Sequence, residues 1–286
     1  MIIGTNSSFF VTQNNSFINS YNVIEQLNKK NKPLHLPNYT YNFFYFALRF
    51  ESTSEYDFIK KISENINVLS DSLNLINAEI SYAKFLELEE NVDFYNKQSE
   101  LQECNDNINK IKNIYEMNIF NKNVYKSIIM PSLSSLTINS DLFLNNINCD
   151  IFVKLLDLFL AVPMYFIDDD HDQVIRKKFF QAGDYSKYGS EISYYFLSNF
   201  WLKSENSNIA KLIYEIISFC YSCLENGDYQ KFYDTSKDYV NVFGYDYFEL
   251  AAALNKSDFV KIKKYLAFIY NFLPVNIITE IENNRY

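Results

Sequence analysis

A helical repeat of apolar side chains between residues 56 and 88 constrains the fold of this chain more than any other feature. The apolar residues recur at steps of four and three, the pattern of an amphipathic helix with one buried face: Phe58, Ile62, Ile66, Leu69, Leu73, Ile76 and Ile80. Only 5 glycines and 5 prolines occur in 286 residues, so little interrupts regular structure. The repeat predicts a long helix from about residue 56 to about residue 88.

Helical patterns continue through the rest of the chain and favour an all-α fold. The stretch at 148–166 is strongly apolar and is expected to be a central buried helix, and Pro131 marks the end of the helix predicted at 93–129. The predicted helices after the first span residues 93–129, 141–146, 148–166, 171–181, 184–202, 207–225, 228–240, 245–254 and 257–271.

A short motif recurs in the second half of the chain, as GDYSKY at 183–188, GDYQKF at 227–232 and, more loosely, NKSDFVKI at 255–262. Each copy sets a small residue and an aspartate before an aromatic, which is typical of a helix start. The copies are unevenly spaced, so a regular solenoid is not expected. The predicted fold is an irregular bundle of antiparallel helix pairs.

Three parts are predicted along the chain. The first 40 residues are rich in asparagine and serine and show no sustained period. We therefore expect residues 1–50 to form an extended or partly ordered N-terminal arm, residues 51–147 an N-terminal helical domain and residues 148–286 a C-terminal helical domain.

The charge balance indicates the kind of partner. The chain has 26 basic and 35 acidic side chains and a net charge of -9, which disfavours direct nucleic-acid binding and suits a basic partner protein. The first residues lack the pattern of a signal peptide, and the longest apolar run, at 151–167, is short for a bilayer. A cytoplasmic protein without membrane binding is expected, and a homodimer is left open.

Motifs for catalysis or cofactor binding are absent from the sequence. Nucleotide-binding glycine loops, zinc-protease motifs and nucleophile elbows do not occur, and the only histidines are His35 and His171. Cys220 and Cys223 form a C-x-x-C pair inside a helical pattern, where ordinary core or helix-surface cysteines are favoured over a redox or zinc site. No enzymatic activity, cofactor or metal is therefore expected.

One dense acidic cluster, DDDHD at 168–172, follows the central apolar stretch. It suits a divalent-cation site, an acidic docking surface or a solvated turn between helices, and the solvated turn is favoured. A docking surface would comprise Asp168, Asp169, Asp170 and Asp172, with Asp184 and Glu191 on the next helix.

Glu249 lies among aromatic and alanine residues in FGYDYFELAAAL, at 243–254. A carboxylate in a buried helix must be hydrogen-bonded. We expect Glu249 to hold the helix packing by accepting hydrogen bonds from a tyrosine, a lysine or free helix-end N–H groups, which is favoured over a catalytic role.

Residues 232–259, FYDTSKDYVNVFGYDYFELAAALNKSDF, resemble the C-terminal signature of the PoNi-type bacterial immunity proteins, which join two helical domains. The signature positions fall on Gly244, Tyr245, Phe248, Glu249 and Ala252, beside Tyr247, Ala251 and Ala253. The tryptophan usual beside the aromatic-Phe-Glu step is missing, and so is the usual Tyr-Tyr-Pro ending.

The resemblance implies a cytoplasmic protein that binds and neutralises a cognate interbacterial toxin, which in the best-known members is a DNase. The partner would be a basic nuclease domain whose active or binding surface is occluded. One alternative is a helical scaffold or regulator that binds peptides along a tyrosine-lined groove. Another is an enzyme that uses the aspartate cluster with a metal.

Overall fold

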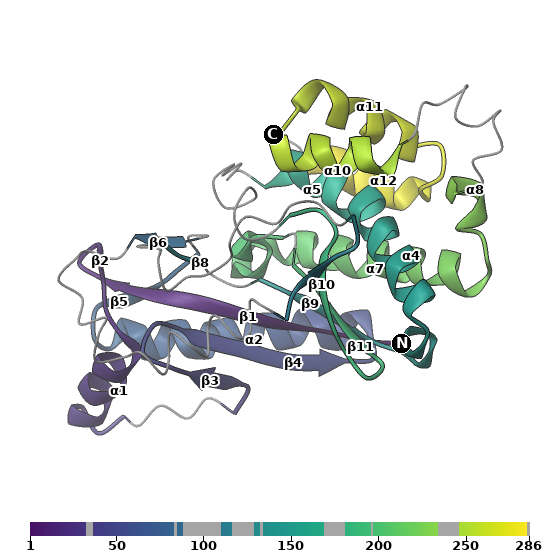
Figure 1. Ribbon diagram of the computed structural model, residues 1–286. Helices are drawn as coiled ribbons and strands as arrows, with labels where there is room; N and C mark the ends of the chain where they lie inside the picture. Colours follow the sequence, from purple (N-terminus) through teal and green to yellow (C-terminus); the bar gives the residue numbers. More distant parts are fainter. Residues whose placement is uncertain are drawn as a thin grey trace.

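A nine-stranded antiparallel sheet forms the centre of the structure, so the all-α prediction is wrong and the fold is mixed α/β (Figure 1). The computed structural model describes residues 1–32, 37–82, 85–87, 110–115, 129–131, 134–168, 181–195, 197–233 and 246–284. The sheet runs in the order β3-β4-β1-β9-β11-β10-β7, and β2 and β5 also pair with β1. A separate pair joins β6 to β8.

The strands of the main sheet are β1 (Ile2–Gln13), β2 (Ser16–Phe17), β3 (Tyr39–Tyr41), β4 (Phe46–Ser52), β5 (Ala78–Ser81), β7 (Lys112–Asn113), β9 (Leu136–Asn139), β10 (Asp184–Tyr188) and β11 (Glu191–Tyr194). The separate pair consists of β6 (Phe85–Glu87) and β8 (Ile129–Pro131).

The helices are α1 (Ser20–Lys29), α2 (Glu55–Asn74), α4 (Asn146–Leu156), α5 (Val162–Ile167), α7 (Ser207–Glu225), α8 (Gln230–Tyr233), α10 (Tyr247–Lys256), α11 (Phe259–Ile269) and α12 (Val275–Asn283). Short 3-10 turns occur at η3 (Asp141–Leu144), η5 (Asn199–Leu202) and η6 (Ser204–Asn206), and a π-helical turn, η4 (Asp157–Ala161), joins α4 to α5. In Figure 1, α2 lies behind β1 and β4, while α10, α11 and α12 form a separate layer beside α5.

Residues 1–50 are not an arm, because they supply β1, the strand at the centre of the sheet, and its neighbour β4. The side of β1 that faces α2 carries hydroxyl groups as well as apolar groups. The alternation of apolar and polar residues that marks a half-buried strand is therefore not visible in its sequence. Thr5 Oγ1 lies 2.7 Å from Ser7 Oγ and donates to the Ser135 carbonyl at 2.7 Å. These bonds satisfy hydroxyls that would otherwise be costly to bury.

Close contact between β1 and β4 depends on Gly4. A Cβ at this position would overlap the carbonyl oxygen of Phe50 and would lie 2.8 Å from Thr137 Oγ1. The missing side chain lets the two neighbouring strands approach β1 from both sides.

The long helix predicted from residue 56 is present as α2, but it ends at Asn74. Its apolar stripe is buried as expected, and Phe58 packs on Phe50 of β4 with ring centroids 5.7 Å apart. After the helix, Asn77 adopts a positive φ of 53° and turns the chain into β5, which contains Ile80. The predicted continuation to residue 88 is therefore wrong.

The helix predicted at 184–202 is wrong, because residues 184–194 form a β-hairpin and residues 199–202 form the 3-10 turn η5. Gly183 has a φ of 84°, and after it β10 pairs with β11 from Tyr185↔Tyr194 to Tyr188↔Glu191. Within the predicted helix at 93–129, residues 112–113 form β7, and most of the remainder lies outside the described residues. The helix at 171–181 also falls mainly outside them.

Other predicted helices are confirmed. The stretch at 207–225 is α7, the third copy of the short motif begins α11, and the apolar stretch at 148–166 is the buried segment α4–η4–α5. Across the part of the chain that the structure describes, no helix has the length and apolar character needed to cross a membrane.

A single cluster of buried hydrophobic side chains runs from Ile3 to Ile281. It draws on β1, on α2 and on the C-terminal helices alike. The predicted boundary between residues 147 and 148 lies in the first turn of α4. The two predicted helical domains thus share one core.

Candidate functional site

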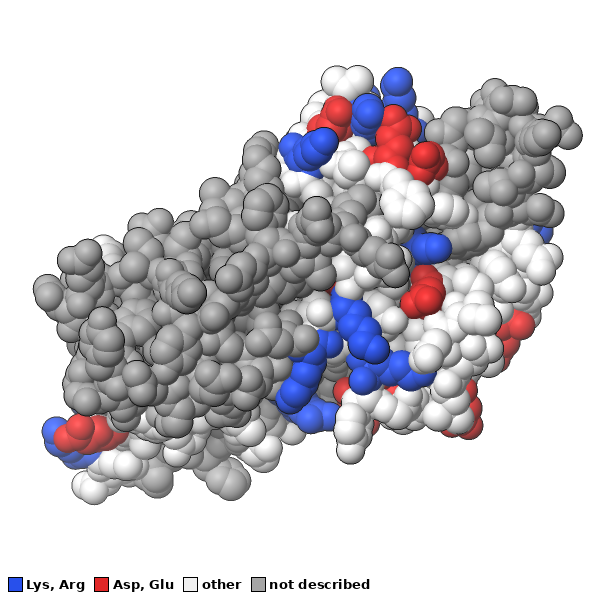
Figure 2. Space-filling model, in the orientation of Figure 1, with Lys and Arg blue, Asp and Glu red and all other residues white. Residues whose placement is uncertain are grey.

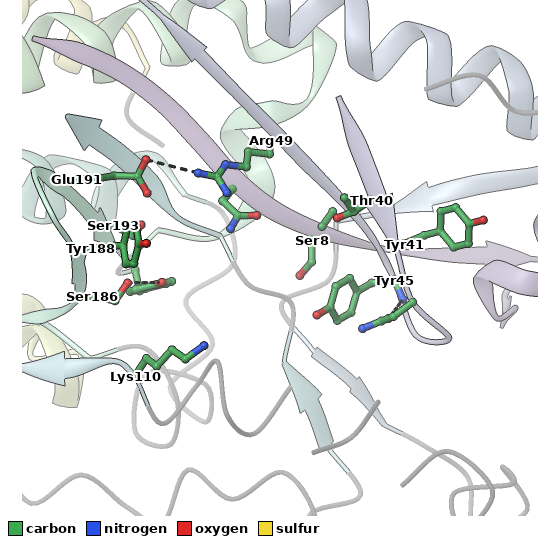
Figure 3. Close-up of a pocket in the computed structure, with 14 residues that line it drawn as sticks. Ser8, Thr40, Tyr41, Tyr45, Arg49, Lys110, Ser186, Tyr188, Glu191 and Ser193 are labelled. Carbon is green, nitrogen blue, oxygen red and sulfur yellow. Dashed lines mark hydrogen bonds and ion pairs between the residues drawn. The ribbon is translucent and has the colours of Figure 1, made fainter. Parts of the chain in front are cut away.

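A hollow of about 530 Å³ lies on the face of the sheet opposite to α2 (Figure 3). We call it the sheet pocket. It is formed by β1, β3, β4, β10 and β11, by the turn between β3 and β4, and by Lys110. Its polar and aromatic lining consists of Asn6, Ser8, Thr40, Asn42, Ser186 and Ser193, of Tyr41, Tyr45, Tyr188 and Tyr195, and of Arg49, Lys110 and Glu191.

The lining follows from the alternation of side chains along each strand. In β4, Phe46, Leu48 and Phe50 are buried on the helix side. Ala47 and Arg49, between them, therefore point to the other face. The same alternation operates along β1, β10 and β11, so the sheet presents its polar residues as one rigid surface.

A tight turn between β3 and β4 sets the position of Tyr45. The side-chain oxygen of Asn42 accepts hydrogen bonds from the backbone N–H groups of Phe44 at 2.9 Å and of Tyr45 at 3.1 Å. Asparagine favours such turns because its side chain caps the backbone locally. Tyr41, at the start of the turn, is half exposed.

Among the described residues, two cations and one anion line the sheet pocket. Arg49 Nη2 lies 3.7 Å from Glu191 Oε2, and Figure 3 shows Lys110 on another side of the hollow. Burial raises the pKa of Glu191, Arg49 opposes this rise, and the nearby Glu51 adds to it. On the face turned to the viewer in Figure 1, Lys and Arg side chains gather near the centre (Figure 2).

The hydroxyl groups of the sheet pocket bond to one another. Ser186 Oγ and Tyr195 Oη lie 2.9 Å apart, and burial raises the pKa of Tyr195, which keeps this phenol protonated. The described lining contains one carboxylate, Glu191, and no histidine or cysteine. The side chains of the sheet pocket can form hydrogen bonds, ring contacts and ion pairs.

A second polar cluster is buried beneath the sheet around Asp157, in the π-helical turn η4. Asp157 Oδ1 accepts from Tyr194 Oη at 2.7 Å and from the Gly183 N–H at 3.1 Å, and Oδ2 accepts from Tyr115 Oη at 2.7 Å. Burial raises its pKa to about 7, and the three hydrogen bonds act against the rise. These contacts tie η4 to β11 and to the turn before β10.

The acidic surface predicted around residue 168 is not what the described residues form. Asp168 is buried and accepts a hydrogen bond from Ser198 Oγ at 2.7 Å. Asp184 is also buried and accepts from Asn113 Nδ2 at 2.8 Å. Both carboxylates are turned into the fold, so neither is offered to a partner.

Glu191 belongs to strand β11 rather than to a helix, and it is the one described residue of the predicted acidic surface that lines the sheet pocket. Asp169, Asp170 and Asp172 lie outside the described residues.

The bonding partners expected for Glu249 are confirmed. Its Oε1 pairs with Lys261 Nζ at 2.7 Å, and its Oε2 accepts from Tyr265 Oη at 3.1 Å.

These contacts link α10 to α11 and lower the pKa of Glu249, the hydrogen bond from Lys261 having the largest effect. The Glu249 side chain is 42% exposed, so the expectation of a buried carboxylate is wrong. Phe248 is exposed on α10, and Ala252 lies partly buried on the same helix. Gly244 and Tyr245 lie outside the described residues.

The C-x-x-C cysteines are ordinary core residues, as predicted. Cys220 and Cys223 are free and buried on α7, and burial raises the pKa of both thiols. Within the described ranges, no group of three or more His, Cys, Asp or Glu side chains is placed to hold a metal ion.

The comparisons with known proteins give no relative. No family model matches the chain, and neither a curated protein nor a solved structure is significantly similar to it.

Sequence reasoning missed the sheet pocket, although one signal was present. Between residues 46 and 52, Phe, Leu, Phe and Ser alternate with Ala, Arg and Glu, which is the period of a half-buried strand. The matching signal in β1 is masked by its inward-facing hydroxyls.

Proposed function

We propose that this protein acts by binding another protein and that the sheet pocket is its contact site. The observation that carries the proposal is the mixture of side chains in the pocket. Tyrosines stand beside serine, threonine and asparagine, with one arginine and one lysine. Binding surfaces of antibodies use the same mixture, because tyrosine gives large contact area at low entropy cost and the small polar residues give adaptable hydrogen bonds.

Two further features support binding over catalysis. The pocket lies on strands, which hold their side chains rigidly and lose little freedom when a partner docks. Its only described carboxylate, Glu191, is paired with Arg49. A volume of about 530 Å³ is suited to a few side chains of a partner inserted into the hollow.

The partner favoured by the sequence is a toxin, which makes the protein an immunity protein acting in the cytoplasm by occlusion. This identity rests on the resemblance at residues 232–259. The binding role does not, because the pocket is built from the sheet and the resemblance implies a helical fold. The two parts of the proposal can therefore be tested separately.

The binding role is tested by removing rings from the pocket. Tyr188 is 88% exposed on β10, and the Tyr45 ring is held by the turn after β3. The partner tested is the product of the neighbouring upstream gene, co-expressed and co-purified with this protein. We expect Tyr45→Ala combined with Tyr188→Ser to weaken the complex by about 2 kcal/mol or more, the scale of a hot-spot ring.

The matched control is Tyr56→Ala, since Tyr56 is 76% exposed on α2, behind the sheet. The control should bind as well as the native protein. If the double variant is folded and binds with native affinity, the sheet pocket is not the contact site.

The immunity role is tested by growth of bacteria that express the same upstream gene product with and without this protein. Rescue of growth together with a stable complex supports the immunity role. A complex without toxicity supports the binding role alone, and strong binding of many unrelated peptides would favour the scaffold function instead.

A further inference from the structure

We propose that the segment received by the sheet pocket is acidic and that one of its carboxylates docks on the guanidinium of Arg49. This inference rests on the proposed binding function and names the chemistry of the partner. It reverses the sequence-based expectation, in which this protein supplied acidic groups to a basic partner.

Arg49 is placed to bind an anion. It projects from β4, an interior strand of the sheet, and its side chain is 62% exposed. Its guanidinium nitrogen stands 3.7 Å from Glu191, whereas hydrogen bonds between arginine and carboxylate measure about 2.7–2.9 Å. The existing pair is therefore loose, and a partner carboxylate can make the closer two-pronged contact that arginine favours.

In the absence of a partner, Glu191 occupies the position beside Arg49 that the partner's carboxylate would take. It approaches Arg49 from β11, and its side chain is only 20% exposed. Its partial burial costs hydration free energy that one long ion pair does not fully recover. Glu191 should therefore compete with an incoming acid for Arg49.

The other groups of the pocket complete an anion site. Lys110, which has a contact of its own, lies on another side of the hollow, so the described lining holds two basic side chains and one acidic side chain. Thr40 carries a hydroxyl that can donate to a carboxylate oxygen. Two basic side chains on one hollow contrast with the net charge of -9 of the whole chain.

A peptide carboxylate fits these features better than a nucleic acid. Binding along a phosphate backbone needs many cations over an extended surface, whereas the described charges of the sheet pocket are confined to one hollow. The tyrosine rings around it suit the side chains of a folded partner or of an extended peptide segment.

The test uses the full protein and an eight-residue peptide of alternating glutamate and serine, with a fluorescent label, titrated at low salt. The matched probe replaces every glutamate with glutamine. We expect the acidic peptide to bind at least tenfold more tightly. Arg49→Gln should weaken its binding about tenfold to a hundredfold, the worth of one charged hydrogen-bonded contact.

Glu191→Gln should strengthen binding of the acidic peptide severalfold, because it removes the competing carboxylate. The control is Lys60→Gln, which removes one positive charge from α2, where the Lys60 side chain is half exposed. This control should leave peptide binding unchanged. It distinguishes an effect of Arg49 at the sheet pocket from an effect of the net charge of the protein.

Equal binding of the two peptides, absence of binding by either, or native binding by Arg49→Gln would overturn the inference. Inorganic phosphate that displaces the peptide at micromolar concentration would show a phosphate site instead. The tyrosine variants of the preceding section alter no charge, so loss of the acidic preference and loss of partner binding are distinguishable.

Discussion

At the scale of single residues, Asp157 has the most unusual environment. The structure places its carboxylate in the core with three donors, yet burial still raises the pKa to about 7. Asp184 lies close enough to add to the rise. A π-helical turn carries Asp157, which rotates the side chain toward Tyr115 and Tyr194.

This pKa predicts that Asp157 makes the protein less stable as the pH rises. The unfolded chain loses the Asp157 proton near pH 4, whereas the folded protein keeps it until about pH 7. Between these values the folded state holds the extra proton, so the free energy of unfolding falls by about 1.4 kcal/mol per pH unit from this group.

Asp157→Asn should remove that slope while keeping the size of the side chain. The measurement is urea unfolding of the native protein and of the variant at pH 5, 6, 7 and 8. The difference between their free energies of unfolding gives the contribution of Asp157 at each pH. Parallel curves across this range would show that its pKa is not raised.

At the scale of elements, the connection between α10 and α11 is the clearest case of local sequence setting local structure. Ser257 ends α10 in the left-handed conformation, with φ 55° and ψ 43°, and Asp258 caps α11 by accepting from the Lys261 N–H at 3.2 Å. The Ser257 hydroxyl oxygen is buried and has no hydrogen-bond partner among the described residues.

Ser257→Gly should stabilise the protein by about 1 kcal/mol, because glycine adopts the left-handed conformation without strain and no hydroxyl is left unsatisfied. Ser257→Ala is the matched control, since it removes the hydroxyl but keeps the Cβ atom. Thermal unfolding should rank glycine above alanine. If alanine is equally stabilising, the strain at this position is negligible.

The type of signal in the sequence explains which helices and strands could be predicted. Helices with a clear apolar stripe, such as α2 and α7, were found, because their burial follows a helical period. The strands were missed where tertiary contacts replace an apolar pattern. In β1, Thr5 and Ser7 face the core and are satisfied by Ser135, far along the chain, so no local signal marks this strand.

The candidate site could be predicted only in part, for the same reason. Glu191 was singled out as an acidic residue, but its partner Arg49 lies on β4, with the two strands β1 and β9 between it and β11. Only the order of the strands in the sheet brings the two side chains together. The partners of Glu249 were predicted because they lie on the next helix. The Glu249 contacts span one helix connection, whereas the pair formed by Arg49 and Glu191 joins residues far apart in the sequence.

At the scale of the whole molecule, one core joins the two halves of the chain. Trp201, the single tryptophan, lies at their meeting point. It is fully buried, stacks on Phe58 of α2 at a centroid distance of 6.1 Å, and donates from Nε1 to Ser134 Oγ at 3.3 Å. Its fluorescence therefore reports on packing between segments far apart in sequence.

A shared core predicts one unfolding transition. We expect the fluorescence of Trp201 and the far-ultraviolet circular dichroism of all helices and strands to change at the same urea concentration. Hydrogen exchange of α11, in the C-terminal layer, supplies an independent probe. Separate midpoints, or early exchange of α11 alone, would show that the halves unfold as two domains.

The central position of β1 has a consequence for synthesis on the ribosome. Ile3 pairs with Ser52 of β4, which follows soon after it, but also with Ile138 of β9, and Asn199 donates a hydrogen bond to the Ser8 carbonyl. At typical rates of translation, roughly 7 s or more separates the synthesis of Ile3 from that of Ile138. Through this interval one edge of the nascent strand stays available to other chains, so β1 is the segment that a ribosome-bound chaperone has most reason to cover.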